Sequence, residues 1–233
     1  MHQAKPQAQG ETFFFVTAIL LLIINIAGFS LAAITIPDHR PPLGFWLILH
    51  AVTSFAWLLL LVTQTGLVRH HRIATHRRLG QWSGLVAAVL VISGVLVAIQ
   101  AMQRTGNFSN AGFQVVSLVN FPVLIGLGLA FRKHSDQHKR FMLIATIAIM
   151  GPALSRLFIS LGLPETLTGL AILAFLVTMI VYDFICLRHI KWATLIGTGL
   201  VVSGTAVAIW LNSSDGWQAF LARTLQSGIA LTT

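Results

Sequence analysis

The chain has 233 residues, of which 56% are hydrophobic and only 9% are charged, and its formal net charge is +9. A soluble domain carries roughly 25% charged residues, so there are too few charges here to cover a surface that faces water. The basic residues occur in short clusters between apolar runs, a pattern typical of membrane orientation rather than of nucleic-acid binding. The composition therefore predicts an integral membrane protein, with the lipid bilayer around it and no nucleic acid as a partner.

The apolar segments predict an all-α fold, because a membrane helix needs about 20 apolar residues. We expect a single transmembrane domain, 1–233, built as a bundle of about seven helices. The expected spans are 13–36, 44–68, 79–101, 113–131, 141–161, 167–187 and 192–211. The first run is longer than the apolar core of a cleaved signal peptide, which favours a retained helix. A proline-rich turn at 37–42 and a polar stretch at 104–107 separate the first spans.

Three loops that would lie on one side of such a bundle are strongly basic. They contain Arg69, Arg72, Arg77 and Arg78, then Arg132, Lys133, Lys139 and Arg140, and finally Arg188 and Lys191. The opposite loops contain only Arg40, Arg104 and Arg223. The positive-inside rule therefore predicts a cytoplasmic N-terminus. After the last span, Trp217, Phe220, Leu221 and Leu225 recur at helical spacing, which predicts a short interfacial helix.

Polar residues within predicted spans are costly and usually face the interior of a bundle. In the second span His50, Trp57, Gln64 and His71 are seven residues apart and share one stripe. This stripe is either a packing seam or a functional surface. His76 opens the third span on a face of small residues, Gly80, Ser83 and Gly84, which predicts close packing against a neighbouring helix.

Further candidates follow in the second half of the chain. His134 and His138 are four residues apart, so both would project from one face of a helix. Arg156 follows Gly151-Pro152, where we expect a kink, and Asn120-Phe121-Pro122 predicts a similar break. Asp183 lies inside the predicted cytoplasmic edge of the sixth span. It would either form a salt bridge with a basic loop or bind or orient a metal ligand.

With seven spans, histidines from three separate junctions reach the predicted cytoplasmic face. We therefore predict a metal or haem site made of His76, His138, Asp183 and His189, with His71 and His134 as additional candidate ligands. Arg156, Gln64 and His50 are the candidates for binding a substrate or anion. The cofactor would be Fe, Zn or haem b. The single cysteine, Cys186, excludes an iron–sulfur cluster, a Cys-based zinc site and a covalent c-type haem.

The order of His50, Gln64, His76-Arg77-Arg78-Leu79-Gly80, His138-Lys139-Arg140-Phe141-Met142 and Arg156 resembles an uncharacterised family of bacterial multi-helix membrane proteins. That family has an H…Q…HRxLG…HxRxM…R pattern, and the likeness covers about residues 45–160. The resemblance implies a multi-pass protein of the bacterial inner membrane. The layout is also similar to that of two-haem membrane cytochromes. Because His50 has no histidine partner on its side, at most one haem is expected, at the inner side.

Three functions remain open from the sequence. The first is a metal- or haem-dependent membrane oxidoreductase acting on a lipophilic molecule such as a quinone. The second is a small transporter with a polar path through Gln64, Asn120 and Arg156. The third is a non-catalytic subunit of a membrane complex, in which polar residues only hold helices together.

Overall fold

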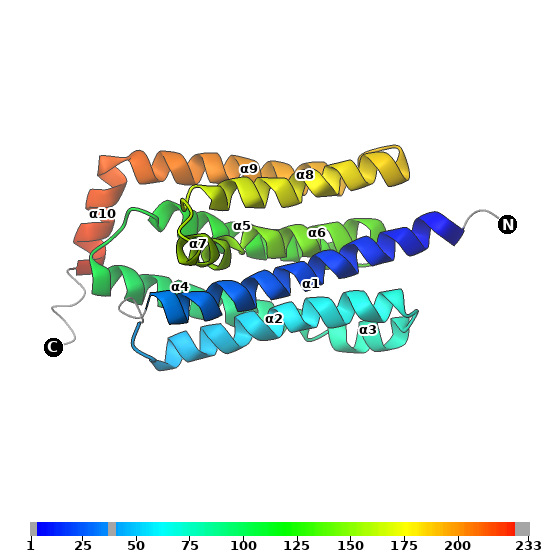
Figure 1. Ribbon diagram of the computed structural model, residues 1–233, viewed down its shortest axis with the longest axis horizontal. Helices are drawn as coiled ribbons and strands as arrows, with labels where there is room; N and C mark the ends of the chain where they lie inside the picture. The colour runs from blue at the N-terminus through cyan, green and yellow to red at the C-terminus, as the bar shows by residue number, and fades with distance from the viewer. Residues whose placement is uncertain (1–3, 37–40, 227–233) are drawn as a thin grey trace.

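The computed structural model describes residues 4–36 and 41–226, except for the side chains of 4–10 and 226. These ranges are helical and contain no strand. Figure 1 shows long helices side by side in one bundle, with the last helix across one end. The helices are α1 (Ala4–Thr35), α2 (Phe45–Arg69), α3 (Ile73–Gly80), α4 (Ser83–Thr105), α5 (Ala111–Ala130), α6 (Ser135–Ala148), α7 (Gly151–Ser160), α8 (Leu167–Leu187), α9 (Trp192–Ser213) and α10 (Asp215–Gln226).

The predicted polytopic bundle is confirmed. In the described ranges six helices, counting α3 and α4 as one, are long and apolar enough to cross a membrane, and the total is seven if α6 and α7 form one broken span. The bend between α6 and α7 is 45° and lies just before Pro152, which cannot donate a backbone hydrogen bond. Pro122 behaves differently from our expectation, because α5 continues through it without a break.

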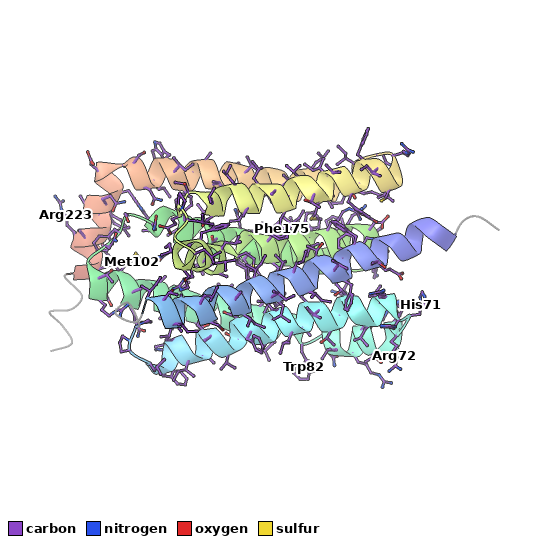
Figure 2. All side chains as sticks on the ribbon, in the orientation of Figure 1. His71, Arg72, Trp82, Met102, Phe175 and Arg223 are labelled. Atoms are coloured by element: carbon purple, nitrogen blue, oxygen red, sulfur yellow. The ribbon has the colours of Figure 1, made fainter. Side chains whose placement is uncertain are left out.

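The three basic loops meet at one end of the bundle. We call this the basic end and define it as residues 69–78, 132–140 and 188–191. Lys191 Nζ lies 3.2 Å from Asp136 Oδ2, which joins the α8–α9 turn to the start of α6. Figure 2 shows His71 and Arg72 at this end, and Met102 and Arg223 at the other. The side of the membrane that it faces stays a prediction, and Arg40 and the turn around it lie outside the described residues.

The end opposite the basic end is covered by α10. Leu221 of α10 packs into a small apolar cluster with Met102, Phe108 and Ala111. Trp217 and Phe220 are stacked with ring centroids 5.9 Å apart. The short helix expected after the last span is therefore present.

The main core runs along the inside of the bundle and includes the first helix. Phe14, Ala18 and Leu21 of α1 are almost fully buried. The indole N–H of Trp57 on α2 donates to the Thr146 hydroxyl on α6 at 3.1 Å. Many large apolar side chains on the outside are exposed, which is stable only where lipid is the solvent. The outer surface thus agrees with a membrane location.

Helices α1 and α7 make one of the closest backbone approaches in the bundle. A β-carbon added at Gly28 would overlap the carbonyl oxygen of Ala153. Backbone atoms cannot move aside as a flexible side chain does, so only glycine is compatible with this contact. The contact fixes the kinked α7 against the first helix.

We expect Gly28→Ala to lower the free energy of unfolding by roughly 1–3 kcal/mol, because α1 and α7 must separate to make room. Gly199→Ala is the matched control, since nothing lies near an added β-carbon there. It should stabilise α9 by about 0.5–1 kcal/mol through higher helix propensity. Thermal unfolding in detergent measures both, and equal midpoints for the two variants would contradict the close contact.

Candidate functional site

Two of the predicted ligands, His76 and His138, come together at the basic end. His76 lies on α3 and His138 on the first turn of α6, 62 positions apart in the sequence. Their ring centroids are 6.3 Å apart and their planes are nearly perpendicular, at 82°. Both side chains are half-buried. No hydrogen bond links the two rings directly among the described residues, and they form a T-shaped, edge-on contact.

The orientation of His138 is set by a backbone group. Its Nδ1 lies 2.7 Å from the carbonyl oxygen of Gly128, near the end of α5. A carbonyl oxygen can only accept, so Nδ1 carries the proton and the neutral ring has its lone pair on Nε2. The approach is close: an added β-carbon at Gly128 would lie 2.8 Å from the sulfur of Met142, so the Met142 side chain would have to move. Close packing of α5 on α6 therefore brings this carbonyl within reach of His138.

His76 is held by the carboxamide of Gln64 on α2. Oriented to satisfy its neighbours, the Gln64 NH2 group donates to His76 Nδ1 at 2.5 Å and to the His76 carbonyl oxygen at 3.2 Å, while its oxygen accepts from the Gly80 N–H at 2.9 Å. An added β-carbon at Gly80 would lie 3.4 Å from the end of the Gln64 carboxamide. Gln64, predicted to bind a substrate, thus contacts one of the two histidines.

Asp183 is occupied by a buried ion pair. Arg140 donates from Nε to both carboxylate oxygens at 3.2 Å, and its terminal Nη2 donates to Oδ1. The Thr194 hydroxyl donates to Oδ2 at 2.6 Å, and the backbone N–H of Lys191 donates to the same oxygen at 3.1 Å. Arg140 is 0% exposed and Asp183 is 1% exposed. Of the two roles considered for Asp183, the structure thus has the salt bridge, which ties α6 to α8 and α9.

The other candidate ligands do not join the pair. His189 is exposed, and its Nδ1 lies 2.9 Å from the carbonyl oxygen of Leu187. His134 is exposed at the start of α6, and His71 is exposed in the α2–α3 turn with a φ of 57°. No group of three or more His, Cys, Asp or Glu side chains able to hold a metal ion is present within the described ranges. The four-residue metal centre is therefore not assembled there.

The polar residues of the transporter hypothesis contact three different helix pairs. Asn120 on α5 donates to the Leu200 carbonyl oxygen on α9 at 3.2 Å. Arg156 donates to the Pro152 carbonyl oxygen within α7, and its guanidinium lies 4.7 Å from the ring centroid of Phe29 on α1. Gln64 joins α2 to α3. Each of these contacts joins a different pair of helices.

His50 lies in the half of α2 away from the basic end. Its Nδ1 is 3.2 Å from the Ser93 hydroxyl on α4, and an added β-carbon at Gly94 would lie 3.2 Å from the ring. This arrangement is a close α2–α4 contact with one hydrogen bond. Of the two interpretations of the stripe formed by His50, Trp57, Gln64 and His71, this contact supports the packing seam at the His50 end.

The sequence did not reveal the importance of Arg140 and Thr194. Arg140 was counted with the basic loop, yet it is completely buried. One feature of the sequence is consistent with this burial, because Asp136 lies four residues before Arg140, one helical turn away. In the structure the Asp136 carbonyl oxygen accepts a hydrogen bond from Arg140 Nη1 at 2.7 Å. A basic residue followed at once by a long apolar run can point into the bundle instead of to water.

Comparison of this chain with protein-family models, with curated proteins and with solved structures finds no match. The function must therefore be argued from the geometry of the site itself.

Breaking the buried ion pair should be strongly destabilising. We expect Arg140→Met or Asp183→Leu to cost roughly 3–5 kcal/mol, because each leaves an uncompensated buried charge. The double variant should lose less than either single variant, since no charge then remains buried. Asp136→Asn is the comparison variant: its carboxylate also lies 3.7 Å from Arg140 Nη1 but is 45% exposed, and such exposed pairs contribute about 0–1 kcal/mol. Thermal unfolding in detergent measures all four, and additive losses in the double variant would argue against the pair.

Proposed function

We propose that this chain is a membrane electron-transfer protein that binds one b-type haem between His76 and His138 at the basic end of the bundle. The observation that carries the proposal is the facing pair of imidazoles, 6.3 Å apart between ring centroids. A metal–imidazole bond is about 2.0–2.1 Å long. Two imidazoles on opposite sides of one iron therefore have centroids about 6–6.5 Å apart once the ring radii are added.

The number of ligands favours haem over the other cofactors considered. A zinc or non-haem iron site takes three or four protein ligands, and the described residues bring only two histidines together. A b-type haem would need no more than two histidines from the protein, because the porphyrin supplies four nitrogens, so His76 and His138 would be sufficient to hold it. With Asp183 engaged by Arg140, two neutral imidazoles remain as the donor set.

The hydrogen bonds around the pair support ligation through Nε2. A ligating histidine almost always donates its other N–H to a carbonyl or carboxylate oxygen. His138 already does so, with Gly128 as the acceptor. His76 would do so only if the Gln64 carboxamide turned over, which would place its oxygen beside Nδ1 and give up the hydrogen bonds to the His76 carbonyl oxygen and from the Gly80 N–H.

The reaction class follows from the coordination. A haem with two imidazole ligands has no open position, so it supplies one-electron transfer rather than oxygen activation. The chain would contribute the two ligands and their orientation, and the surrounding membrane would exclude water from the site. A lipophilic redox partner such as a quinone is consistent with a site at the edge of the bilayer, and stays part of the proposal.

Optical spectra test the proposal directly. Protein purified from haem-sufficient cells should show a Soret band and sharp reduced bands of a low-spin b-type haem. His76→Ala and His138→Ala should each lose most of this absorbance, because one imidazole holds haem far less firmly than two. Iron analysis on the same samples should give one iron per chain for the unmodified protein.

Matched controls come from the same end of the molecule. His134→Ala removes an exposed histidine one turn before His138, and His70→Ala removes one from the α2–α3 turn. Both should keep the haem spectrum. Unmodified protein with no Soret absorbance, or equal haem in all four variants, would disprove the proposal and leave the pair as a structural contact.

A second prediction concerns Gln64. Gln64→Glu offers a charged acceptor to the His76 Nδ1–H, which makes the ligand more basic and should lower the haem midpoint potential. Gln64→Leu removes the acceptor and should raise it. Gln103→Leu is the control, because Gln103 bonds to the Leu225 carbonyl oxygen at the opposite end. Potentiometric titration measures the shifts, and shifts of the same sign for both Gln64 variants would argue against this contact.

A further inference from the structure

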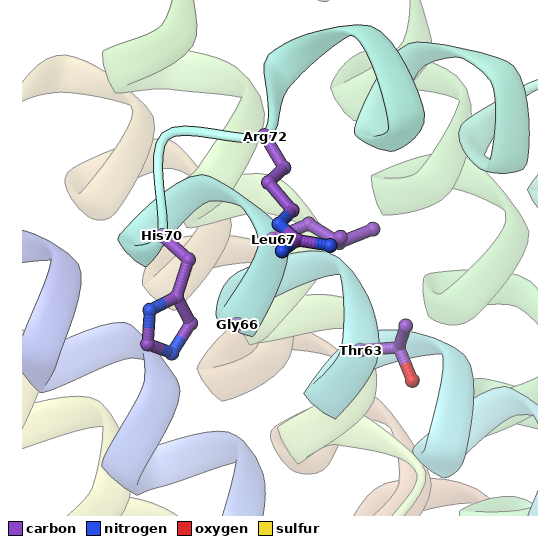
Figure 3. Close-up of a pocket in the computed structure, with 5 residues that line it drawn as sticks. All are labelled: Thr63, Gly66, Leu67, His70 and Arg72. Atoms are coloured by element: carbon purple, nitrogen blue, oxygen red, sulfur yellow. The ribbon is translucent and has the colours of Figure 1, made fainter.

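A groove lies on the side of α2 at the basic end. It has a volume of about 530 Å³ and is lined by Thr63, Gly66, Leu67, His70 and Arg72 (Figure 3). Thr63, Gly66 and Leu67 belong to the last two turns of α2, and His70 and Arg72 belong to the turn that follows. The groove is thus apolar along the helix and cationic at its mouth, and it does not include either histidine of the proposed haem site.

The backbone of the α2–α3 turn holds the polar mouth in place. Arg72 N–H donates to the Leu67 carbonyl oxygen at 2.8 Å, and His71 N–H donates to the Val68 carbonyl oxygen at 2.9 Å. With His71 in the left-handed region, at a φ of 57°, this is the double hydrogen bond of a Schellman helix end. The turn reverses the chain, so the side chains of His70 and Arg72 extend back along α2 toward the groove (Figure 3).

The positive charge at this mouth is not neutralised by the described part of the protein. None of the ion pairs among the described residues involves Arg72. Of the carboxylates near the basic end, Asp136 pairs with Lys139, Lys191 and Arg140, and Asp183 is held by Arg140. Glu11, one turn before Phe15 on α1, is in none of these ion pairs. Arg69, the last residue of α2, lies 5.2 Å from the ring centroid of Phe15. Arg72 is exposed, so its guanidinium is accessible to an anion from outside the chain.

We propose that this groove binds an anionic phospholipid. Its phosphate would lie between His70 and Arg72, and one acyl chain would run along Thr63, Gly66 and Leu67. An arginine side chain donates two parallel hydrogen bonds to a phosphate, and basic pockets at the membrane edge favour anionic headgroups. An added β-carbon at Gly66 would lie 3.2 Å from the Phe15 ring, so this glycine lets α1 pack closely against α2 beside the groove. This site is independent of haem binding.

The test uses the full chain in nanodiscs of phosphatidylcholine with a minor fraction of phosphatidylglycerol. Native mass spectrometry counts the phosphatidylglycerol retained after mild detergent transfer. We expect retention by the unmodified protein and at least about tenfold weaker binding for Arg72→Gln, because this change removes the two charge-assisted hydrogen bonds to the phosphate. Thr63→Phe, which fills the apolar part of the groove without removing charge, should also weaken binding.

Arg132→Gln is the control, since it removes one exposed charge from another loop of the same end. It should leave retention unchanged. Equal losses for Arg72→Gln and Arg132→Gln would show that binding depends only on net charge and would overturn the proposal. Retention of phosphatidylcholine in place of phosphatidylglycerol, or of neither lipid, would overturn it as well.

Discussion

The buried pair of Arg140 and Asp183 determines how α6 is placed against α8 and α9. Two charges with almost no exposure are stable in such an interior only when each satisfies the other. Arg140 and His138 are two positions apart on α6, so their side chains point about 200° apart around the helix axis. While Arg140 faces α8 and α9, His138 is turned toward α3 and α5. The same ion pair that stabilises the bundle therefore orients one of the two histidines.

Charged and neutral polar groups have separate roles at the basic end. Asp183 is surrounded by donors that hold it in place. His76 and His138 are instead held by a carboxamide and a backbone carbonyl, both uncharged. Neither partner is a carboxylate, so no anion in contact favours the charged imidazolium, and the neutral ring is the form that binds iron. Asp183, whose carboxylate oxygens are already occupied by these donors, is therefore not in contact with the two histidines.

Hydropathy predicted the spans well, because the length of an apolar run reports bilayer thickness directly. Local chemistry was harder to predict. Pro152 follows Gly151, so two weak helix formers coincide and the helix breaks there. Pro122 follows the almost fully buried Phe121, and α5 stays helical on both sides of this proline because it is packed against its neighbours there. For the site, His76 and His138 were among the predicted ligands. The partner of Asp183 was not predicted, because Arg140 is 43 positions away and helix rotation cannot be read from spacing between separate helices.

The likeness to an uncharacterised family stays a prediction, but several of the residues between His50 and Arg156 on which it was based make defined contacts between helices. Gln64 and Gly80 meet around His76, Gly128 and Met142 meet beside His138, and Arg156 lies against α1. These contacts tie separate helices into one arrangement. Any sequence with the same pattern would need the same helix neighbours to satisfy them.

The contact between Gly28 and Ala153 also bears on how the protein is made. The two residues are 125 positions apart in the chain, yet their helices touch through the backbone. During synthesis α1 enters the bilayer long before α7 exists. Ala18 and Leu21, completely shielded in the finished bundle, must therefore spend that interval against lipid or a helper protein. The earliest segment to be inserted is thus one of the last to reach its final environment.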